Sequence, residues 1–321
     1  MNENLSRSQF NQIGTAEKQA LMERLSARYD MTFLGLQSFD RWGQSCTTGI
    51  FEKGGREFVF VPGDTVTLGW DHFAVGLNPD SRWELDYLFQ EWEMEPRDPE
   101  EMIRESMAPV RQAAIGPMLV GRELEELCWE PVALDDPRLR PEWLEEFRQF
   151  ALTGRDSLTL VGHARFERDG DGWQAALYHR MDYSDFRSQL EQQGLSLPTA
   201  DEWAYLCGGG CRTLFPWGDG MDYSMHLHHF ESPEAEDKPF DMEEPNFFGL
   251  SIAYDPYMRE IVKAEQFTTC GGDGGCNICG GLGIFLGFLP CSPHRKPEVQ
   301  EDKELNGDYD FCRPIIRVES I

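Results

Sequence analysis

Basic side chains are scarce in this sequence. Its 321 residues include 29 lysines and arginines against 57 aspartates and glutamates, which gives a formal net charge of −28. A polyanion of this size is repelled by phosphate backbones and by anionic lipid surfaces. We therefore expect no nucleic acid and no membrane among its partners. We interpret the acidic surplus as a solvated surface that keeps the protein in solution.

Long apolar runs are also missing. No stretch approaches the roughly 18 apolar residues of a membrane-spanning helix, and the first residues carry neither the basic segment nor the apolar segment of a secretory signal. The cysteine count is nine, an odd number. Because secreted domains usually pair their cysteines, we expect free thiols and a cytoplasmic protein.

Motifs of serine hydrolases and of phosphate-binding loops do not occur either. The sequence contains no GxSxG, no GxxxxGKS or GxxxxGKT, and no internal repeat. What it does contain is an ordinary globular composition, with 40% hydrophobic residues, 31 glycines and 19 prolines. This composition predicts a large, loop-rich domain with a sizeable core rather than a bundle of long helices.

Periodicity and turn residues divide the chain coarsely. Residues 1–48 are expected to form an N-terminal helical extension with a helix over 16–28, and residues 49–321 the main domain. Alternating apolar residues over 51–68 predict paired strands. Further helices are predicted at 99–106, 122–127, 142–152 and 184–193, and further strands at 157–165 and 173–178.

The most informative segment begins at Pro198. Thr199 is followed three residues later by Glu202, which is the spacing of a capping box at the start of a helix. Trp203 and Leu206 would share one face of this helix. The glycines at 208–210 would end it after about two turns.

The same segment resembles a family signature. Pro198-Thr199-Ala200-Asp201-Glu202-Trp203, followed by Phe215-Pro216-Trp217-Gly218-Asp219, is similar to a motif of the formylglycine-generating enzyme family, also called the sulfatase-modifying-factor domain. Three more blocks, at 58–69, 244–250 and 271–273, resemble that family in the same order. The resemblance extends from about position 50 to the end of the sequence. It implies an irregular, loop-rich α+β fold of the C-type-lectin-like architecture.

The resemblance also implies a cysteine site near the C-terminal end. Active members of the family bind copper(I) through two cysteine thiolates, which are soft ligands selective for that ion. They use it with oxygen to convert a cysteine of a protein substrate to formylglycine. Counting from Gly271-Gly272 places the first thiolate at Cys276, and the second at Gly281, whose nearest cysteine is Cys279.

Other positions depart from the family pattern. The serine and tryptophan that follow the two glycines in the family are Asp273 and Gly274 here. The block that helps to hold calcium in the family is replaced by residues 255–261, which keep only its glutamate, Glu260. Calcium is therefore not expected.

The cysteines also allow interpretations that do not depend on the family. Cys276 and Cys279 form a CxxC pair, which is half of a tetrahedral zinc site. Cys270, Cys291 or the pair of Cys207 and Cys211 would complete it. A redox-active pair is a further alternative. The sequence favours a purely structural interpretation, in which these cysteines are small residues packed in glycine-rich loops.

A group of histidines offers another candidate site. His226, His228 and His229 lie close in sequence to Asp219 and Asp222, and imidazoles beside carboxylates are ligands for divalent metals. We favour a solvated loop cluster, because no other element of a metal site accompanies these residues.

Two functional hypotheses follow. The favoured one is a divergent, non-catalytic binding or scaffold module for a protein or small-molecule ligand, because features of the family's catalytic pocket depart together while the architectural blocks remain. The alternative is a thiol- and copper-dependent oxidoreductase that uses Cys276 and Cys279, or a structural zinc site at the same cysteines.

Overall fold

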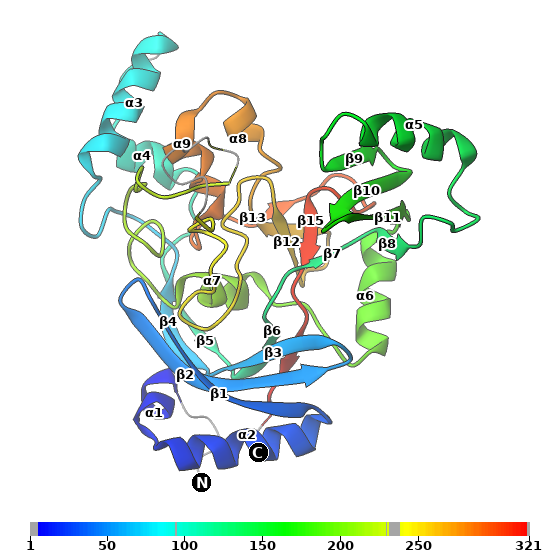
Figure 1. Cartoon of the computed structure of the whole chain (residues 1–321). Helices are drawn as coiled ribbons and strands as arrows, with labels where there is room; N and C mark the ends of the chain where they lie inside the picture. Colours follow the sequence, from blue (N-terminus) through cyan, green and yellow to red (C-terminus); the bar gives the residue numbers. More distant parts are fainter. Residues whose placement is uncertain (1–5, 94, 229, 231–237, 320–321) are drawn as a thin grey trace.

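The computed structural model describes residues 6–93, 95–228, 230 and 238–319. In these residues several small sheets and helices are joined by long loops, so the fold is of the mixed α+β class that the sequence predicts (Figure 1). Pairs of named strands are antiparallel here except for β12 (Arg259–Val262) and β15 (Asp310–Cys312). Within the described ranges, none of the helices has the length and apolar character needed to cross a bilayer.

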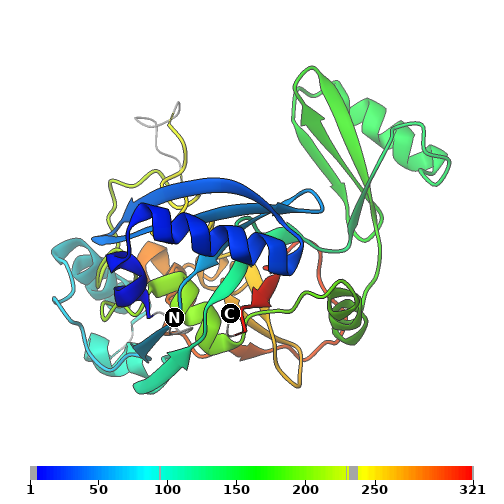
Figure 2. The same ribbon diagram turned by 90° about the horizontal axis from the view of Figure 1, so that it is seen from below.

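The first sheet brings the two ends of the chain together (Figures 1 and 2). Ile315, close to the C-terminus, pairs with Val120, and helix α2 (Thr15–Tyr29) packs against the sheet and buries Met22 and Leu25. A short helix, α1 (Arg7–Gln12), precedes α2. The strand order is β1 (Thr32–Arg41), β2 (Gln44–Lys53), β3 (Arg56–Val61), β6 (Met118–Gly121) and β16 (Ile315–Arg317).

The expected boundary at position 48 lies inside strand β2. The helix predicted over 16–28 is confirmed as α2, but β2 pairs with β1 on one side and with β3 on the other. Phe10 also packs on Phe60, with ring centroids 5.3 Å apart. Residues 6–48 are therefore built into the main fold rather than appended to it.

A second sheet has the strand order β14 (Glu298–Val299), β13 (Thr268–Gly271), β12, β15 and β7 (Glu125–Glu126). The helix predicted over 122–127 is wrong, because Glu125 and Glu126 pair with Cys312 and Phe311 across the strands. A separate pair joins β4 (Asp64–Leu68) to β5 (Arg111–Ile115).

Helix α7 (Ala200–Gly208) lies between the sheets (Figure 1). The capping box is formed as predicted: the Thr199 hydroxyl accepts the Glu202 N–H at 3.2 Å, and the Glu202 carboxylate accepts the Thr199 N–H at 2.7 Å. The helix ends where Gly209 adopts the left-handed conformation, with φ of 59°. Its side chains are core residues, and Trp203 is only 1% exposed.

A lobe with its own apolar core projects from the body (Figure 2). The helix predicted over 142–152 is confirmed as α5 (Pro141–Ala151), whose Phe147 stacks on Phe166 of the sheet beneath it. The strand predicted over 157–165 is two strands, because a turn follows Leu160. The sheet consists of β8 (Trp129–Val132), β11 (Gly172–Tyr178), β10 (Ala164–Asp169) and β9 (Ser157–Leu160).

The remaining helices lie mostly at the end of the body away from α2 (Figure 1). They are α3 (Pro79–Glu91), α4 (Pro99–Arg104), α8 (Cys276–Cys279), α9 (Gly283–Gly287) and the 3-10 turn η2 (Leu289–Cys291), with α6 (Tyr183–Gln192) beside the lobe. Glu84 links α3 to α9, because its carboxylate accepts the N–H groups of Ile284 and Phe285 at 2.6 and 2.8 Å.

Candidate functional site

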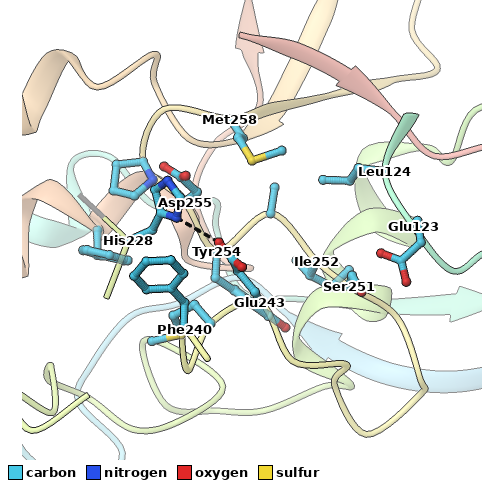
Figure 3. A pocket seen from close by; sticks show the side chains of 14 residues that line it. Glu123, Leu124, His228, Phe240, Glu243, Ser251, Ile252, Tyr254, Asp255 and Met258 are labelled. Atoms are coloured by element: carbon cyan, nitrogen blue, oxygen red, sulfur yellow. Dashed lines mark ion pairs between the residues drawn. The ribbon is translucent and has the colours of Figure 1, made fainter. Parts of the chain in front are cut away.

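Loops from distant parts of the chain surround a pocket of about 360 Å³, which we call the loop pocket (Figure 3). The segment 251–258 forms one wall, and the segments around 123–124 and 240–243 form others. The lining residues are Glu123, Leu124, His228, Phe240, Met242, Glu243, Ser251, Ile252, Ala253, Tyr254, Asp255, Pro256, Met258 and Phe288.

The wall formed by 251–258 is held firmly by the core. The Tyr254 hydroxyl donates to the carbonyl of Cys207 at the end of α7, at 2.8 Å, and the Trp217 ring packs edge-on against the Tyr254 ring. The Ser251 carbonyl accepts a hydrogen bond from Arg313 at 2.6 Å. The pocket is therefore formed before any ligand arrives, as small-molecule sites usually are.

The lining is apolar inside and acidic at its edge. Buried Ile252, Ala253 and Phe288 contribute to the interior, and the carboxylates of Glu123, Glu243 and Asp255 complete the lining. None of the described residues that line the loop pocket is a lysine or an arginine. A ligand with an apolar body and a positive group matches this combination, because aromatic faces and carboxylates both attract cations.

Among the described residues of this lining, His228 contributes the one imidazole. Its Nδ1 lies 2.9 Å from the Glu243 carboxylate (Figure 3). The pair fixes the Glu243 side chain at the mouth of the pocket. Glu123 and Asp255 also line the pocket, and the Asp255 carboxylate accepts the Tyr257 N–H at 2.8 Å.

Sequence reasoning missed this pocket. Its lining comes from segments more than a hundred residues apart, which share no spacing pattern. The available signal was the composition of Tyr254-Asp255-Pro256-Tyr257-Met258, where aromatic, acidic and thioether side chains alternate without helical or strand periodicity. In the comparison with the family, residues 255–258 only mark a departure from the block that helps to hold calcium.

The structure places Cys276 and Cys279 together on the single helical turn α8, and both are exposed. The Sγ of Cys279 lies 3.5 Å from the Tyr257 hydroxyl, and this contact raises the pKa of Tyr257 to about 12. The Tyr257 ring covers Gly275, where a Cβ would collide with it. The CxxC pair is therefore accessible, and the tyrosine lies over the start of its turn.

Cys207 and Cys211 lie in a different environment. Cys207 is fully buried with its Sγ 3.9 Å from the Cys291 carbonyl, and Cys211 has its Sγ 3.9 Å from Nε2 of His294. Burial raises the pKa of the Cys207 thiol well above its usual value and that of Cys211 to about 12. Burial also lowers the pKa of His294 to about 4. At neutral pH these are a neutral imidazole and neutral thiols.

The two cysteine pairs do not meet. Across the described ranges, no three side chains of histidine, cysteine, aspartate or glutamate are grouped so that they could hold a metal ion. A tetrahedral zinc site needs four such ligands. Cys207, Cys211, Cys276 and Cys279 therefore do not form the four-cysteine zinc site that was one of the alternatives from the sequence.

Glu260, the glutamate kept from the family's calcium block, is engaged inside the core. Its carboxylate is fully buried and pairs with the guanidinium of Arg313, with Nε to Oε2 at 3.2 Å. A buried carboxylate neutralised by an arginine does not suit a divalent cation, which requires several free oxygen ligands.

His226 and His228 both pack on the ring of Phe240, at 4.3 and 4.6 Å between ring centroids, whereas the two aspartates are engaged elsewhere. His226 has its Nδ1 2.9 Å from the Lys238 carbonyl, and Asp219 is buried and accepts the N–H groups of Leu214 and Val75 at 2.7 Å each. Asp222 accepts the N–H of Ser224 at 2.9 Å. His229 lies outside the described residues. Asp219 is thus a structural bridge.

Comparison with known proteins adds no relative. No protein-family model matches the sequence, and no curated protein matches it significantly.

Proposed function

We propose that this protein is a divergent member of the formylglycine-generating enzyme family that acts as a binding module. Its ligand site is the loop pocket, and its ligand carries an apolar body with a positively charged group. The ligand is a small amine or the basic side chain of a protein partner. The observation that carries the proposal is the pairing of an apolar interior with carboxylates in one preformed pocket.

Support for the family comes from the residues that carry the resemblance. Trp203 is buried, and Trp217 stacks on Phe215 at 4.8 Å between ring centroids. The Asn246 side chain, in the third block, accepts the Phe248 N–H at 2.9 Å and donates to the Leu206 carbonyl at 2.8 Å. These blocks meet around α7, as inherited architectural elements should.

The charge of the chain supports the choice of a cationic ligand. A net charge of −28 raises the local concentration of cations and speeds their arrival at acidic clefts. Inside an apolar pocket the attraction between an ammonium group and a carboxylate is stronger than in bulk water. A neutral ligand of the same shape would gain only the apolar contacts.

Calorimetric titration with benzylamine and with benzyl alcohol tests this proposal. The two compounds have nearly the same shape, but only the amine is charged at neutral pH. We expect benzylamine to bind more tightly, and Glu243→Gln to weaken it about fivefold, which corresponds to about 1 kcal/mol. Glu146→Gln on α5 removes the same charge from an exposed position outside the pocket and should leave binding unchanged. Equal affinities for amine and alcohol would contradict the proposal.

A second candidate rests on the exposure of Cys276 and Cys279 on one turn. Two adjacent thiolates suit copper(I), which when bound would supply oxygen activation as in the resembled oxidases. Titration of reduced protein with copper(I), compared with Cys276→Ser and Cys279→Ser, separates the two candidates. Tight stoichiometric binding that both substitutions abolish favours the oxidoreductase. Metal content that neither substitution changes favours the binding module.

A further inference from the structure

A second pocket, of about 270 Å³, lies on the other side of the wall that bounds the loop pocket; we call it the arginine pocket. The wall is a pair of backbone segments: the Gly272 N–H donates to the Met258 carbonyl at 2.7 Å, and the Asp273 N–H to the Pro256 carbonyl at 2.8 Å. Its lining is Ser106, Thr269, Cys270, Gly271, Gly272, Pro290, Arg295, Lys296, Pro297 and Glu298.

The backbone that carries Arg295 is fixed on both sides. The carbonyl of His294 accepts the Ala108 N–H at 2.8 Å, and the Lys296 N–H donates to the Ser106 carbonyl at 3.1 Å. His294 itself is buried, with its Nε2 3.0 Å from the Thr213 carbonyl. The Arg295 side chain therefore leaves a rigid support and enters a defined cavity.

The guanidinium of Arg295 makes no hydrogen bond or ion pair with any residue that the structure describes. Two other arginines, by contrast, form ion pairs: Arg259 has its Nη2 2.8 Å from the Asp310 carboxylate, and Arg313 pairs with Glu260. The carboxylates of Glu298 and Asp273 attract the Arg295 guanidinium, but no hydrogen bond or ion pair joins either of them to it.

Partial burial makes this arrangement costly. Arg295 is half-buried, and its loss of hydration lowers the pKa of the guanidinium, which still keeps its charge at any physiological pH. Its five N–H donors can be satisfied by water or by the oxygens of a bound anion. Lys296, also in the lining, donates from Nζ to the Glu105 carbonyl at 2.8 Å and adds a second positive charge beside the first.

From this geometry we propose that the arginine pocket binds an oxyanion, the carboxylate or phosphate group of a small ligand. The planar guanidinium of Arg295 would take two oxygens at once, and Lys296 would add a point charge. Glu298 at the edge disfavours highly charged anions and leaves room for a single oxyanion group. This site is independent of the loop pocket and of its cationic ligand.

The test uses two probes, inorganic phosphate and acetate, whose binding is followed by ligand NMR at constant ionic strength. We expect Arg295→Gln to weaken binding about tenfold or more, since a charge-assisted bidentate contact is lost. The anion affinity of Arg295→Lys should lie between those of wild type and Arg295→Gln, because lysine keeps the positive charge but lacks the planar guanidinium that binds two oxygens. The matched control is Arg24→Gln on α2, which removes the same charge from an exposed arginine and should change nothing.

The probes also distinguish the sources of the oxyanion. Binding of acetate alone identifies a carboxylate ligand, and binding of phosphate alone identifies a phosphate ligand; either supports the proposal. Binding that is equal in wild type and Arg295→Gln, or no binding of either anion to wild type, overturns it. A urea denaturation curve of Arg295→Gln, compared with that of wild type, checks that the fold is intact. If that variant does not fold, slowed labelling of Arg295 by phenylglyoxal in the presence of the anion replaces it, and unchanged labelling overturns the proposal.

Discussion

The guanidinium of Arg313 and the carboxylate of Glu260 form a two-point ion pair in the core, with Nε to Oε2 and Nη2 to Oε1 both at 3.2 Å. Both side chains are fully buried. Arg313 also donates to the carbonyls of Gly121 and Ser251, so the pair joins β12 to the end of β6 and to the wall of the loop pocket.

Removing the negative partner of this ion pair should therefore destabilise the fold strongly. Glu260→Gln leaves a buried guanidinium without its counter-charge, and we expect the free energy of unfolding to fall by about 3–5 kcal/mol. Urea denaturation measures this. The matched control is Glu57→Gln, which breaks the ion pair of Glu57 with Arg122 near the surface and should cost less than about 1 kcal/mol. Equal losses in the two variants would contradict the assignment of Glu260 to the core.

The capping box at α7 gives a smaller, local prediction. Thr199→Ala removes the acceptor for the Glu202 N–H and should lower the free energy of unfolding by about 1 kcal/mol. Thr199→Ser keeps the hydroxyl and should stay close to wild type. Denaturant melts of both variants provide the comparison, and an alanine variant as stable as the serine variant would show that the cap contributes nothing.

The buried imidazole of His294 predicts a dependence of stability on pH. Burial lowers its pKa in the folded state to about 4, whereas in an unfolded chain it is about 6.5. Because the unfolded state binds the proton more readily, this group's contribution is complete above about pH 6.5 and is lost as the pH falls toward 4. The slope is at most about 1.4 kcal/mol per pH unit.

The comparison with His294→Gln isolates this effect, because the other titrating groups are common to both proteins. The variant cannot take up the proton, so its destabilisation relative to wild type should shrink as the pH is lowered from 7 toward 5. Unfolding free energies at several pH values measure the difference. A difference that stays constant over this range would show that His294 is not buried in its neutral form.

Thiol accessibility gives a prediction that needs no substitution. Cys276 and Cys279 are exposed, whereas Cys207 and Cys291 are fully buried and their burial raises the pKa of each thiol. Since the thiolate is the reactive form, iodoacetamide should label the exposed pair at least about tenfold faster under native conditions. Peptide mass spectrometry reads the rates. Labelling of Cys207 at the rate of Cys276 would contradict the packing around α7.

The local elements of the fold could be predicted from the sequence. The box of Thr199 and Glu202 fixed the start of α7, and Gly209 its end, because both signals act through backbone groups within one turn. Helix α5 was equally accessible through its apolar stripe. By contrast, β7 was predicted as helix, since its two residues are strand only through their partners in β15.

The candidate sites could not be predicted in the same way. The CxxC pair was visible as a pattern, but its distance from Cys207 and Cys211 depends on how α8 packs relative to the end of α7. The loop pocket joins Glu123 to Phe288, and the arginine pocket joins Ser106 to Arg295. No spacing rule connects residues that are this far apart in sequence, so only their placement in three dimensions reveals what they share.

A crystal structure of the protein soaked with benzylamine tests directly whether the loop pocket binds a cationic ligand with an apolar body. We predict that the benzylamine ring lies in the loop pocket against Phe240, Met258 and Phe288. Its ammonium group should contact the carboxylate of Glu243 or Glu123. A loop pocket that stays empty at saturating amine, or an amine bound only elsewhere on the acidic surface, would contradict it.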